Sequence, residues 1–553
     1  MKSEIETAIA DVCKNLFSVD VRVELTRPDE QFGDFATNVS LQLAGKLHKN
    51  PREIAAALQE KLSLTLGEVS VAGPGFLNIR LSDEKLVESL GAKPTATLAG
   101  KTVVMEYSDP NPFKPLHAGH LYTTLVGDTI SRLVENAGAK TIRLNFGGDV
   151  GLHVGRCMWG IIKYLGGEHP EKLTEISEAE RPQWMGARYV EGNTAYENND
   201  AAKAEIIATN KKVYGLHESG DHESPFAQIY WTCRQWSYDY FATLYRQLQV
   251  KAFDRFIPES EVTPLGVQTV NEQLKKGVFQ HSDGAVVFDG TKAGLHTRVF
   301  VNSEGLPTYE TKDVGLSLTK WQDYHFDESI IITANEQMQY MQVVLAAIGQ
   351  FAPEPAERTR HLTHGVVKLR GGVKISSRKG NGPSALDILD AAREAGAETG
   401  TNPNEDTILA AVKYAFVRNR IGGDIIYDPK ESIALEGNSG PYLQYAHARA
   451  RSILAKVSEQ EKATLTDLQD DERSLLRKIS EYSEVLDRAT LELMPHHICT
   501  YLYELAQIFN RFYEHNHVIG DERQAVRLTL VEYYADTIKN GLELLGITAP
   551  ERM

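Results

Sequence analysis

The sequence predicts an α/β protein built around a doubly wound parallel sheet, with an α+β domain before the sheet and an all-α domain after it. Two observations lead to this prediction. A strand-prone run at residues 103–105, a proline-rich loop at 108–112 and a helical pattern at 117–136 follow one another, an order typical of nucleotide-binding folds. After Leu435, apolar residues such as Leu502, Leu505 and Phe509 recur at helical spacing.

The 553 residues are expected to form three or four domains. Residues 1–82 mix helical patterns with a closing strand, and residues 83–100 are interpreted as a linker because Pro94 stands among glycine, alanine and threonine. The central domain is expected at 101–434, with a charged and polar insertion near 166–224. A helical domain is expected at 435–553.

Composition describes an ordinary soluble globular protein, with 42% hydrophobic and 24% charged residues. No apolar run approaches the length of a membrane span. The acidic start, Met1-Lys2-Ser3-Glu4, lacks the features of a signal or transit peptide, so we expect a cytoplasmic protein without a membrane partner. The net charge of −16 lends no support to nucleic-acid binding, which depends on local Lys and Arg.

The four cysteines, at positions 13, 157, 233 and 499, are far apart and form no C-x-x-C pair. A zinc site or a disulfide framework is therefore not expected, and buried free thiols are the prediction.

Two separated motifs indicate chemistry. His117-Ala118-Gly119-His120 supplies two imidazoles at i and i+3 at the start of a helix, with a glycine between them. The stretch at 374–380, Lys-Ile-Ser-Ser-Arg-Lys-Gly, is a flexible Lys/Ser/Gly loop. Taken together, the motifs indicate a site that holds ATP and stabilises charge on its α-phosphate.

Several stretches, in this order, complete a pattern that covers nearly the whole chain. They are Phe32-Gly33-Asp34-Phe35-Ala36-Thr37-Asn38, Glu106-Tyr107-Ser108-Asp109-Pro110-Asn111 running into Lys114-Pro115-Leu116-His117, Asn145-Phe146-Gly147-Gly148-Asp149, Tyr309-Glu310-Thr311-Lys312-Asp313, and residues 435–446. The pattern resembles the class I aminoacyl-tRNA synthetases, in their arginyl-tRNA synthetase version. The resemblance implies attachment of arginine to its tRNA through an arginyl-adenylate.

In that chemistry an amino-acid carboxylate joins the α-phosphate of ATP and pyrophosphate leaves. His117 and His120 are suited to the charge that develops, and the helix start adds its dipole and free N–H groups. Gly119 would let the adenine approach the backbone. Lys374, Ser376 and Ser377 would neutralise the β- and γ-phosphates together with Mg²⁺.

The lysine loop departs from the class pattern K-M-S-K-S, because Ser377 stands at the second lysine and Ile375 replaces methionine. Arg378 or Lys379 could supply the missing charge. Lys114, just upstream of the His motif, is a further candidate, and we expect it to contribute to neutralising the phosphates.

The resemblance also implies the residues that select arginine. A guanidinium offers five fixed donors, so its site needs paired acceptors. By family position, Asp313 with Tyr309 and Gln337 would hold the side chain, while Asn111 and Glu106 would hold the amino-acid end and its surroundings.

The helical C-terminal domain is expected to read the anticodon, with Tyr442 and Tyr445 as stacking platforms and Arg449 among the basic candidates. In this family the N-terminal domain contacts the outer corner of the tRNA, and the enzyme is usually a monomer. Two alternatives stay open. One is a small-molecule nucleotidyltransferase or ligase of the same fold, and the other is a catalytically silent paralogue that binds tRNA.

Overall fold

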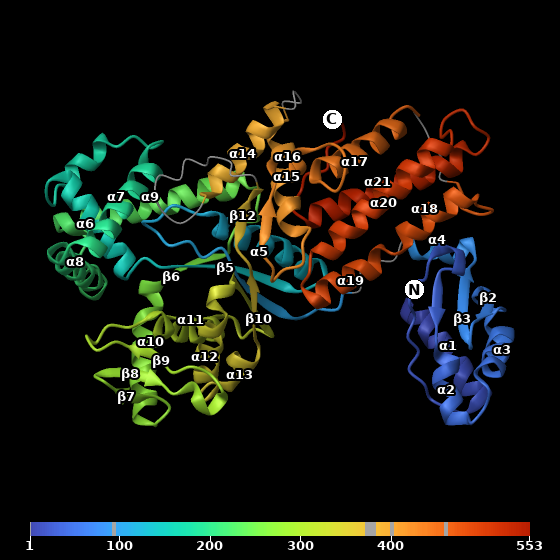
Figure 1. Ribbon diagram of the computed structural model, residues 1–553, viewed down its shortest axis with the longest axis horizontal. Helices are drawn as coiled ribbons and strands as arrows, with labels where there is room; N and C mark the ends of the chain where they lie inside the picture. The colour runs from blue at the N-terminus through green and yellow to red at the C-terminus, as the bar shows by residue number, and fades with distance from the viewer. Residues whose placement is uncertain (1, 91–95, 371–382, 399–402, 458–462) are drawn as a thin grey trace.

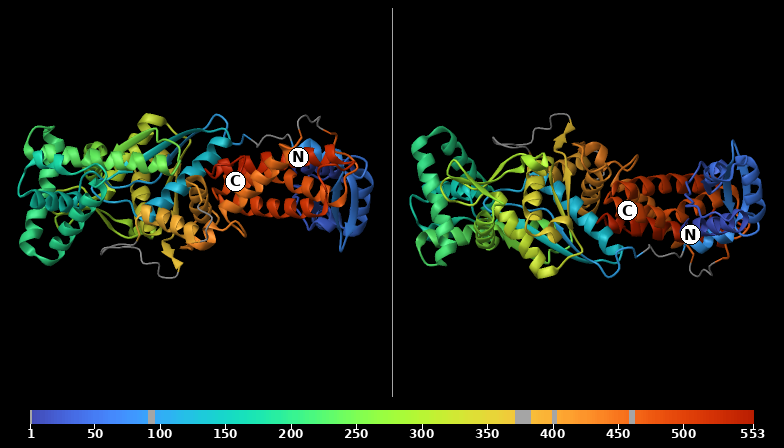
Figure 2. Two further views of the ribbon diagram at one scale, coloured as in Figure 1. Left: turned by 90° about the horizontal axis from the view of Figure 1, so that it is seen from above. Right: turned by 90° about the horizontal axis from the view of Figure 1, so that it is seen from below.

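The computed structural model describes residues 2–90, 96–370, 383–398, 403–457 and 463–553 (Figure 1). The molecule is elongated. In both views of Figure 2, the N-terminal domain and the helices of the insertion lie at opposite ends, with the C-terminal helices and the central sheet between them.

The N-terminal part is an α+β unit, as predicted. Its antiparallel sheet has the order β1-β3-β2, and the predicted closing strand is β3, which pairs with both other strands. The elements are α1 (Lys2–Phe17), η1 (Glu30–Phe32), β1 (Phe35–Thr37), α2 (Val39–Leu47), α3 (Pro51–Leu62), β2 (Gly67–Ala72), β3 (Phe76–Leu81) and α4 (Asp83–Leu90).

The central sheet has five parallel strands in the order β11-β10-β4-β5-β6, so the chain changes direction across the sheet between β4 and β10. This is the place where doubly wound folds bind ligands. The elements are β4 (Thr102–Glu106), α5 (Ala118–Asn136), β5 (Lys140–Gly147), β6 (Arg255–Pro258), α10 (Glu259–Lys275), α11 (Tyr309–Tyr324), β10 (Glu328–Ala334), α12 (Met338–Gly349), α13 (Pro353–Glu357) and β11 (Thr359–His364).

Alternating side chains of β4 show that helices cover both faces of the sheet. Val103 and Met105 belong to the core that includes Leu121 of α5. Val104 points to the other face, where it packs with Val262 of α10 and other apolar residues. Since successive strand residues face opposite ways, both faces of β4 are apolar and buried, and the doubly wound prediction is confirmed.

Two segments interrupt the sheet. The first is a helical insertion between β5 and β6, where α6 and α7 approach closely because a Cβ on Gly160 or Gly192 would lie within 2.3 Å of the carbonyl oxygen of the opposite helix. The second carries a small antiparallel sheet after α10. The elements of these two segments are α6 (Leu152–Leu165), η2 (Pro170–Glu175), α7 (Arg181–Asn198), α8 (Asp200–Ser219), α9 (Pro225–Gln247), β7 (Gln280–Ser282), β8 (Ala285–Phe288), η3 (Gly290–Ala293) and β9 (Arg298–Val301). The short helix η4 (Asn335–Gln337) directly follows β10.

The C-terminal part is helical, as the spacing of its apolar residues predicted. Leu502, Leu505, Phe509 and Phe512 are all buried. A short parallel pair, β12 with β13, comes before α16 and the helices that follow it, and α14 and α15 lie between the two strands in the chain. The elements are β12 (Val367–Leu369), α14 (Ala385–Glu398), α15 (Glu405–Val417), β13 (Ile425–Tyr427), α16 (Pro429–Ile433), α17 (Gly440–Leu454), α18 (Asp470–Ser480), α19 (Tyr482–Glu492), α20 (His496–His515) and α21 (Gln524–Leu544).

The turn after α21 joins the C-terminal helices to the central domain. Lys413 of α15 is buried, and its ammonium group donates to the carbonyl oxygen of Gly546. Arg132 of α5 donates to the carbonyl oxygen of Glu543 at 3.4 Å. The helix that begins next to His117 is therefore in contact with the C-terminal helices at its other end.

Candidate active site

His117 and His120 lie together at the start of α5, just beyond the carboxyl end of β4. Nδ1 of His117 accepts hydrogen bonds from the backbone N–H groups of Gly119 (3.1 Å) and His120 (3.4 Å). Nδ1 of His120 accepts from the backbone N–H of His117 at 3.4 Å. The two rings stack with their centroids 3.8 Å apart. This reciprocal cap fixes both imidazoles in place.

The cap also determines which ring nitrogen carries the proton. Because each Nδ1 accepts a hydrogen bond, each neutral ring holds its proton on Nε2 and offers that N–H as a donor. The sequence led us to expect free backbone N–H groups here, but those of Gly119 and His120 are taken by His117. A Cβ on Gly119 would lie 2.9 Å from the His117 ring, so the cap itself requires glycine.

Both imidazoles are held in the neutral form. Burial, and then the charge of His117, lower the pKa of His120 well below its ordinary value. Desolvation, and then the charge of Lys114, lower the pKa of His117. The rings therefore act as hydrogen-bond donors at neutral pH and not as fixed cations.

A third histidine, which sequence reasoning missed, lies behind this pair. His364 ends β11, and its Nε2 lies 2.6 Å from the hydroxyl of Thr123 on α5. Its ring packs 4.3 Å from the ring of Tyr122. Burial lowers the pKa of His364 to about 4, so a neutral imidazole packs β11 against the first turns of α5. No motif in the sequence marked this residue.

The central residues of the lysine loop, Lys374, Ser376 and Ser377, lie outside the described residues. The chain that follows the loop is described, and it runs beside the His motif. The backbone N–H of Ala118 donates to the carbonyl of Pro383 at 2.8 Å, and that of Ala385 donates to Leu116 at 3.0 Å. Residues 383–385, which follow the loop in the chain, are thereby held against the start of α5.

Lys114 lies between the His motif and the insertion. Its Nζ stands 5.1 Å from the ring centre of Tyr189 on α7, a cation–π contact. Its charge contributes to the lowered pKa values of His117 and His120. The charge of Lys114 is thus felt by both imidazoles.

Two buried acidic side chains, Glu106 and Asp313, lie near the carboxyl end of β4, and we call their surroundings the acidic pocket. Glu106, the last residue of β4, is buried and accepts a 2.5 Å hydrogen bond from Lys320 of α11. Lys320 also donates to the hydroxyl of Ser329 at 3.2 Å. This lysine offsets the charge of Glu106 inside the protein.

Asp313 lies in the same pocket but has a neutral partner. Its carboxylate accepts a hydrogen bond from the hydroxyl of Tyr340 on α12. Burial raises the pKa of Asp313 to about 8, the hydrogen bond from Tyr340 opposes the rise, and the charge of Glu106 adds to it. A buried carboxylate with such a pKa is suited to receive a cationic ligand.

The remaining arginine-site candidates lie at the same edge. The side-chain oxygen of Asn111 accepts a 3.0 Å hydrogen bond from the backbone N–H of Gly148, which leaves its amide N–H₂ available. Tyr309 begins α11 and is 53% exposed, so its ring is accessible to a ligand. Gln337 is also exposed and ends η4, just after β10. Asn111 and Gln337 thus follow β4 and β10 in the chain, and Tyr309 lies one helical turn before Asp313 on α11.

Sequence reasoning missed the buried ion pairs around this pocket, including Glu259 with Lys312 at 2.5 Å. One signal could have indicated Lys320. Asp313, Ser317 and Lys320 stand at i, i+4 and i+7, and all three are buried. A polar stripe on one face of a helix inside an α/β domain indicates a site rather than a core.

The three tRNA-site candidates lie on α17. Tyr442 is partly buried, and its hydroxyl accepts a 2.8 Å hydrogen bond from Asn510. Tyr445 is 44% exposed. The guanidinium of Arg449 stacks over the ring of Tyr513 at 4.5 Å. Tyr445 is therefore the more accessible of the two predicted stacking platforms.

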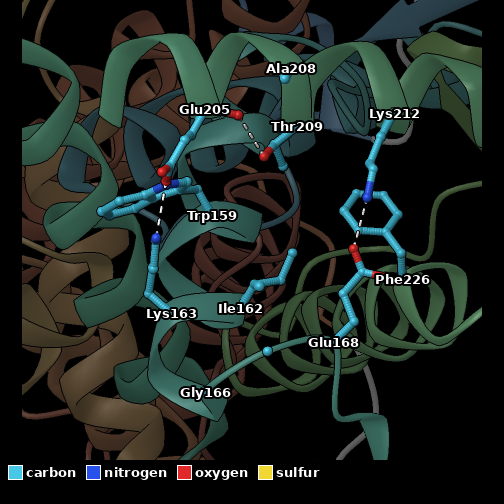
Figure 3. Close-up of a pocket in the computed structure, with 11 residues that line it drawn as sticks. Trp159, Ile162, Lys163, Gly166, Glu168, Glu205, Ala208, Thr209, Lys212 and Phe226 are labelled. Carbon is cyan, nitrogen blue, oxygen red and sulfur yellow. Dashed lines mark hydrogen bonds and ion pairs between the residues drawn. The ribbon is translucent and has the colours of Figure 1, made fainter. Parts of the chain in front are cut away.

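A separate cavity of about 540 Å³ lies within the insertion (Figure 3). Lys163 pairs with Glu205 at 3.0 Å, and Lys212 pairs with Glu168 at 2.8 Å, so the charged groups on its wall offset each other. Trp159 donates to Glu205 at 2.7 Å. This cavity shares no residue with the His motif or the acidic pocket.

Three further findings describe the chemistry available. All four cysteines are buried and unpaired, which confirms the prediction of free thiols. In the part of the chain that the structure describes, no cluster of His, Cys, Asp and Glu is arranged to hold a metal ion. None of the described helices has the length and apolar character needed to span a membrane.

Comparison with known families matches all three parts of the chain. Residues 84–430 match the family of "tRNA synthetases class I (R), catalytic domain". Residues 443–553 match the "DALR anticodon binding domain", and residues 1–81 match the "Arginyl tRNA synthetase N terminal domain".

Individual proteins agree. The chain is 29% identical over 598 residues to the arginine–tRNA ligase of Porphyromonas gingivalis, covering 100% of this chain and 99% of that protein. It is similarly related to the enzyme of Parabacteroides distasonis, at 29% over 604 residues and 100% of both chains. Among solved structures, arginyl-tRNA synthetase of Thermus thermophilus superposes with a TM-score of 0.80 at 26% identity, over 100% of both chains.

The resemblance inferred from the motifs is therefore confirmed, together with the class I catalytic fold and the helical C-terminal domain. The chain belongs to the arginyl-tRNA synthetase family of class I aminoacyl-tRNA synthetases, the ligases that join arginine to tRNA.

Proposed function

We propose that this ligase activates arginine with ATP at the edge of the sheet between β4 and β10. A carboxylate oxygen of arginine forms a bond to the α-phosphorus, the bond to the β-phosphate oxygen breaks, and pyrophosphate leaves. The arginyl group then passes to a ribose hydroxyl at the 3′ end of tRNA, and AMP is released. The stacked pair His117–His120 beside the acidic pocket carries the proposal.

In this proposal the Nε2–H groups of His117 and His120 donate to the α-phosphate oxygens as negative charge develops on them. Because the reciprocal cap has already fixed both rings, no reorganisation is needed when the reaction occurs. Neutral donors also avoid placing two like charges 3.8 Å apart. Gly119 lies between these groups, on the side where the adenine would approach.

Lys374, Ser376 and Ser377 are proposed to contact the β- and γ-phosphates, and Lys114 is proposed to contribute to neutralising them. The packing of residues 383–385 along residues 116–118 supports this, because the chain that follows the lysine loop lies beside the His motif. Mg²⁺ is proposed to accompany ATP. The described side chains form no metal-binding cluster, so we assign it no protein ligand and no step.

Arginine is proposed to lie with its guanidinium against Asp313, Tyr309 and Gln337. Asn111 and Glu106 are proposed to hold the amino-acid end and its surroundings. The side-chain oxygen of Asn111 is held by the N–H of Gly148, and the carboxyl group of Asp313 forms no ion pair among the described residues; both observations support these roles. Lysine would leave part of such a site without hydrogen bonds, which can reject it by roughly 10⁴-fold.

We propose that residues 435–553 read the anticodon, with Tyr442, Tyr445 and Arg449 as contacts. Residues 1–82 would contact the outer corner of the tRNA, joined through a linker at 83–100 to the catalytic domain at 101–434. On family precedent, the enzyme is proposed to act as a cytoplasmic monomer.

The direct test is aminoacylation of bulk tRNA with each of the twenty amino acids supplied separately, together with ATP and Mg²⁺. We expect charging with arginine alone. Charging with another amino acid would keep the class I chemistry but reject the roles given to Asp313 and Tyr309. Absence of charging with any amino acid would favour the small-molecule ligase or the silent paralogue, and ATP–pyrophosphate exchange would separate these two.

A further inference from the structure

A row of buried polar side chains leads from the central sheet to the backbone of His120. The reciprocal cap joins only residues 117–120, so it fixes the two imidazoles relative to each other and not relative to the sheet. The row consists of Asn145 on β5, Tyr245 on α9, Ser108 in the loop after β4 and Thr124 on α5. Each of these side chains is buried, and none is more than 6% exposed.

Consecutive polar atoms in this row lie within hydrogen-bonding distance. Nδ2 of Asn145 lies 3.1 Å from Oη of Tyr245, which lies 2.8 Å from Oγ of Ser108. The serine oxygen lies 2.7 Å from Oγ1 of Thr124. The threonine hydroxyl donates to the carbonyl oxygen of His120 at 2.7 Å. We call this continuous series of hydrogen bonds the Asn145–His120 chain.

The last acceptor determines the direction of every bond in the chain. A carbonyl oxygen can only accept, so Thr124 uses its single hydroxyl proton for His120. Thr124 must then accept from Ser108, and Ser108 must accept from Tyr245. The tyrosine oxygen accepts in turn from the amide of Asn145, which can supply the proton. All the protons therefore point toward His120.

The first donor is held in place as well. Nδ2 of Asn145 also donates to the carbonyl oxygen of Tyr107 at 3.4 Å, and this second acceptor sets the orientation of the amide. The ring of Tyr245 packs 5.1 Å from that of Phe253. Aligned hydrogen bonds in a buried environment polarise one another, so such a chain is stiffer than its separate bonds.

We propose that the Asn145–His120 chain positions His120 for the activation of arginine. It ties the backbone of this histidine to β5, to α9 and to the loop after β4, and thereby holds the Nε2–H group where the α-phosphate arrives. The inference rests on the role proposed for His120 and extends it to residues that act through His120.

The chain should affect the rate of activation more than the binding of substrates. A donor that stabilises developing charge must already be in place when the reaction occurs, and a displacement of about 1 Å can cost roughly 100-fold in rate. An interaction needed only in the transition state lowers kcat and leaves KM nearly unchanged. A general loss of packing would instead appear in the melting temperature.

The test compares Thr124→Val with Thr124→Ser. Valine keeps the shape of the side chain but has no hydroxyl, whereas serine keeps the hydroxyl and loses a methyl group. We expect kcat for ATP–pyrophosphate exchange, measured with tRNA present, to fall roughly 10- to 100-fold in Thr124→Val. KM for ATP and for arginine should stay within about threefold. Thr124→Ser should retain about half of the wild-type kcat or more, because its hydroxyl can still donate to His120.

Thr129→Val is the matched control. Thr129 is also buried in α5, and its hydroxyl donates to the carbonyl oxygen of Leu125 at 2.8 Å, four residues earlier. This substitution should lower the melting temperature about as much as Thr124→Val and leave kcat unchanged. Equal falls in kcat in the two valine variants, or a larger fall in Thr124→Ser than in Thr124→Val, would overturn the inference.

Tyr245→Phe tests the chain nearer its other end, because phenylalanine keeps the ring beside Phe253 and removes only the hydroxyl. We expect kcat to fall, with both KM values unchanged. Combined with Thr124→Val, the fall should be close to the larger of the two single effects, because both substitutions break the same chain. A fall equal to the product of the single effects would show that the two residues act independently and would reject the chain.

His120→Ala distinguishes failure of the inference from failure of the proposed site. If His120→Ala slows ATP–pyrophosphate exchange and Thr124→Val does not, only the role of the chain is wrong. If neither substitution slows the exchange, the role proposed for His120 is wrong.

Discussion

The carboxylate of Asp34 accepts a 2.8 Å hydrogen bond from Arg473, although 439 positions separate them in the sequence. Asp34 directly precedes β1 of the N-terminal sheet, Arg473 belongs to α18, and both side chains are almost inaccessible to solvent. Asp34 also accepts from the backbone N–H of Leu81 at 2.7 Å. The motif at residues 32–38 thus supplies a buried joint between the N-terminal and C-terminal domains.

Asp34→Asn should weaken this joint. A buried arginine that loses its partner typically costs about 3–5 kcal/mol, and we expect the lower end because Asp83 still faces Arg473 at 3.4 Å. Calorimetry should show an earlier unfolding transition, and KM for tRNA should rise more than KM for arginine. The exposed Asp29→Asn is the control, expected within 0.5 kcal/mol of wild type. An unchanged transition in Asp34→Asn would mean that the joint adds no stability.

Lys114→Ala should slow activation. If this lysine contacts the phosphates as proposed, the loss of a charged hydrogen bond predicts a fall of roughly 10-fold or more in ATP–pyrophosphate exchange, measured with tRNA present. KM for arginine should stay within twofold. Lys140→Ala serves as the control, because Lys140 is exposed and begins β5, at the amino end of that strand. Its rate of ATP–pyrophosphate exchange should equal that of wild type. Activation within twofold of wild type in Lys114→Ala would reject the role.

Asp313 should make the stability of the substrate-free enzyme depend on pH. Its folded-state pKa of about 8 lies above its ordinary value of 3.8, so the folded state holds the proton more tightly than the unfolded state does. The resulting stability is fully present below about pH 4 and is lost as pH rises toward 8. Melting temperatures between pH 5 and 8.5 should therefore decline less steeply in Asp313→Asn.

Arginine should oppose that decline, because a cation stabilises the ionised carboxylate. The gain in melting temperature from saturating arginine should grow as pH rises, and Asp313→Asn should remove most of that growth. In Asp313→Ala, the rate of aminoacylation should no longer depend on the concentration of arginine. A wild-type KM for arginine in this variant would contradict the assignment.

Tyr445→Ala should weaken tRNA binding without destabilising the protein. The exposed ring can stack on a base, and such stacking is worth about 1–3 kcal/mol, so KM for tRNA should rise roughly 10-fold. Tyr442→Ala removes a more buried ring whose hydroxyl is held by Asn510, and should lower the melting temperature as well. Equal effects of both substitutions on KM and on stability would show that Tyr445 has no separate binding role.

The sequence was sufficient for features that depend on local pattern. The helix expected at residues 117–136 is α5, the strand expected from Lys140 is β5, and the apolar spacing after Leu435 does produce helices. These succeed because periodicity, proline and glycine act over a few residues. The capping role of His117 could also have been considered from its place just before the helix.

Contacts between residues far apart in the sequence could not be predicted in this way. Lys320 reaches Glu106 across 214 positions, and His364 reaches Thr123 across 241. Only the strand order brings these pairs together, and no local pattern encodes it.

The position of β10 beside β4 has a consequence for synthesis. About 220 residues separate Glu106 from Glu328, yet the two strands are hydrogen-bonded neighbours. At 5–20 residues per second, a ribosome needs roughly 10 to 45 s to make the chain between them. Throughout that interval the apolar strand β4 has an open edge, which is a template for aggregation. The nascent enzyme should therefore depend on chaperones most strongly before β10 emerges, and slowing translation between the two strands should lower its soluble yield.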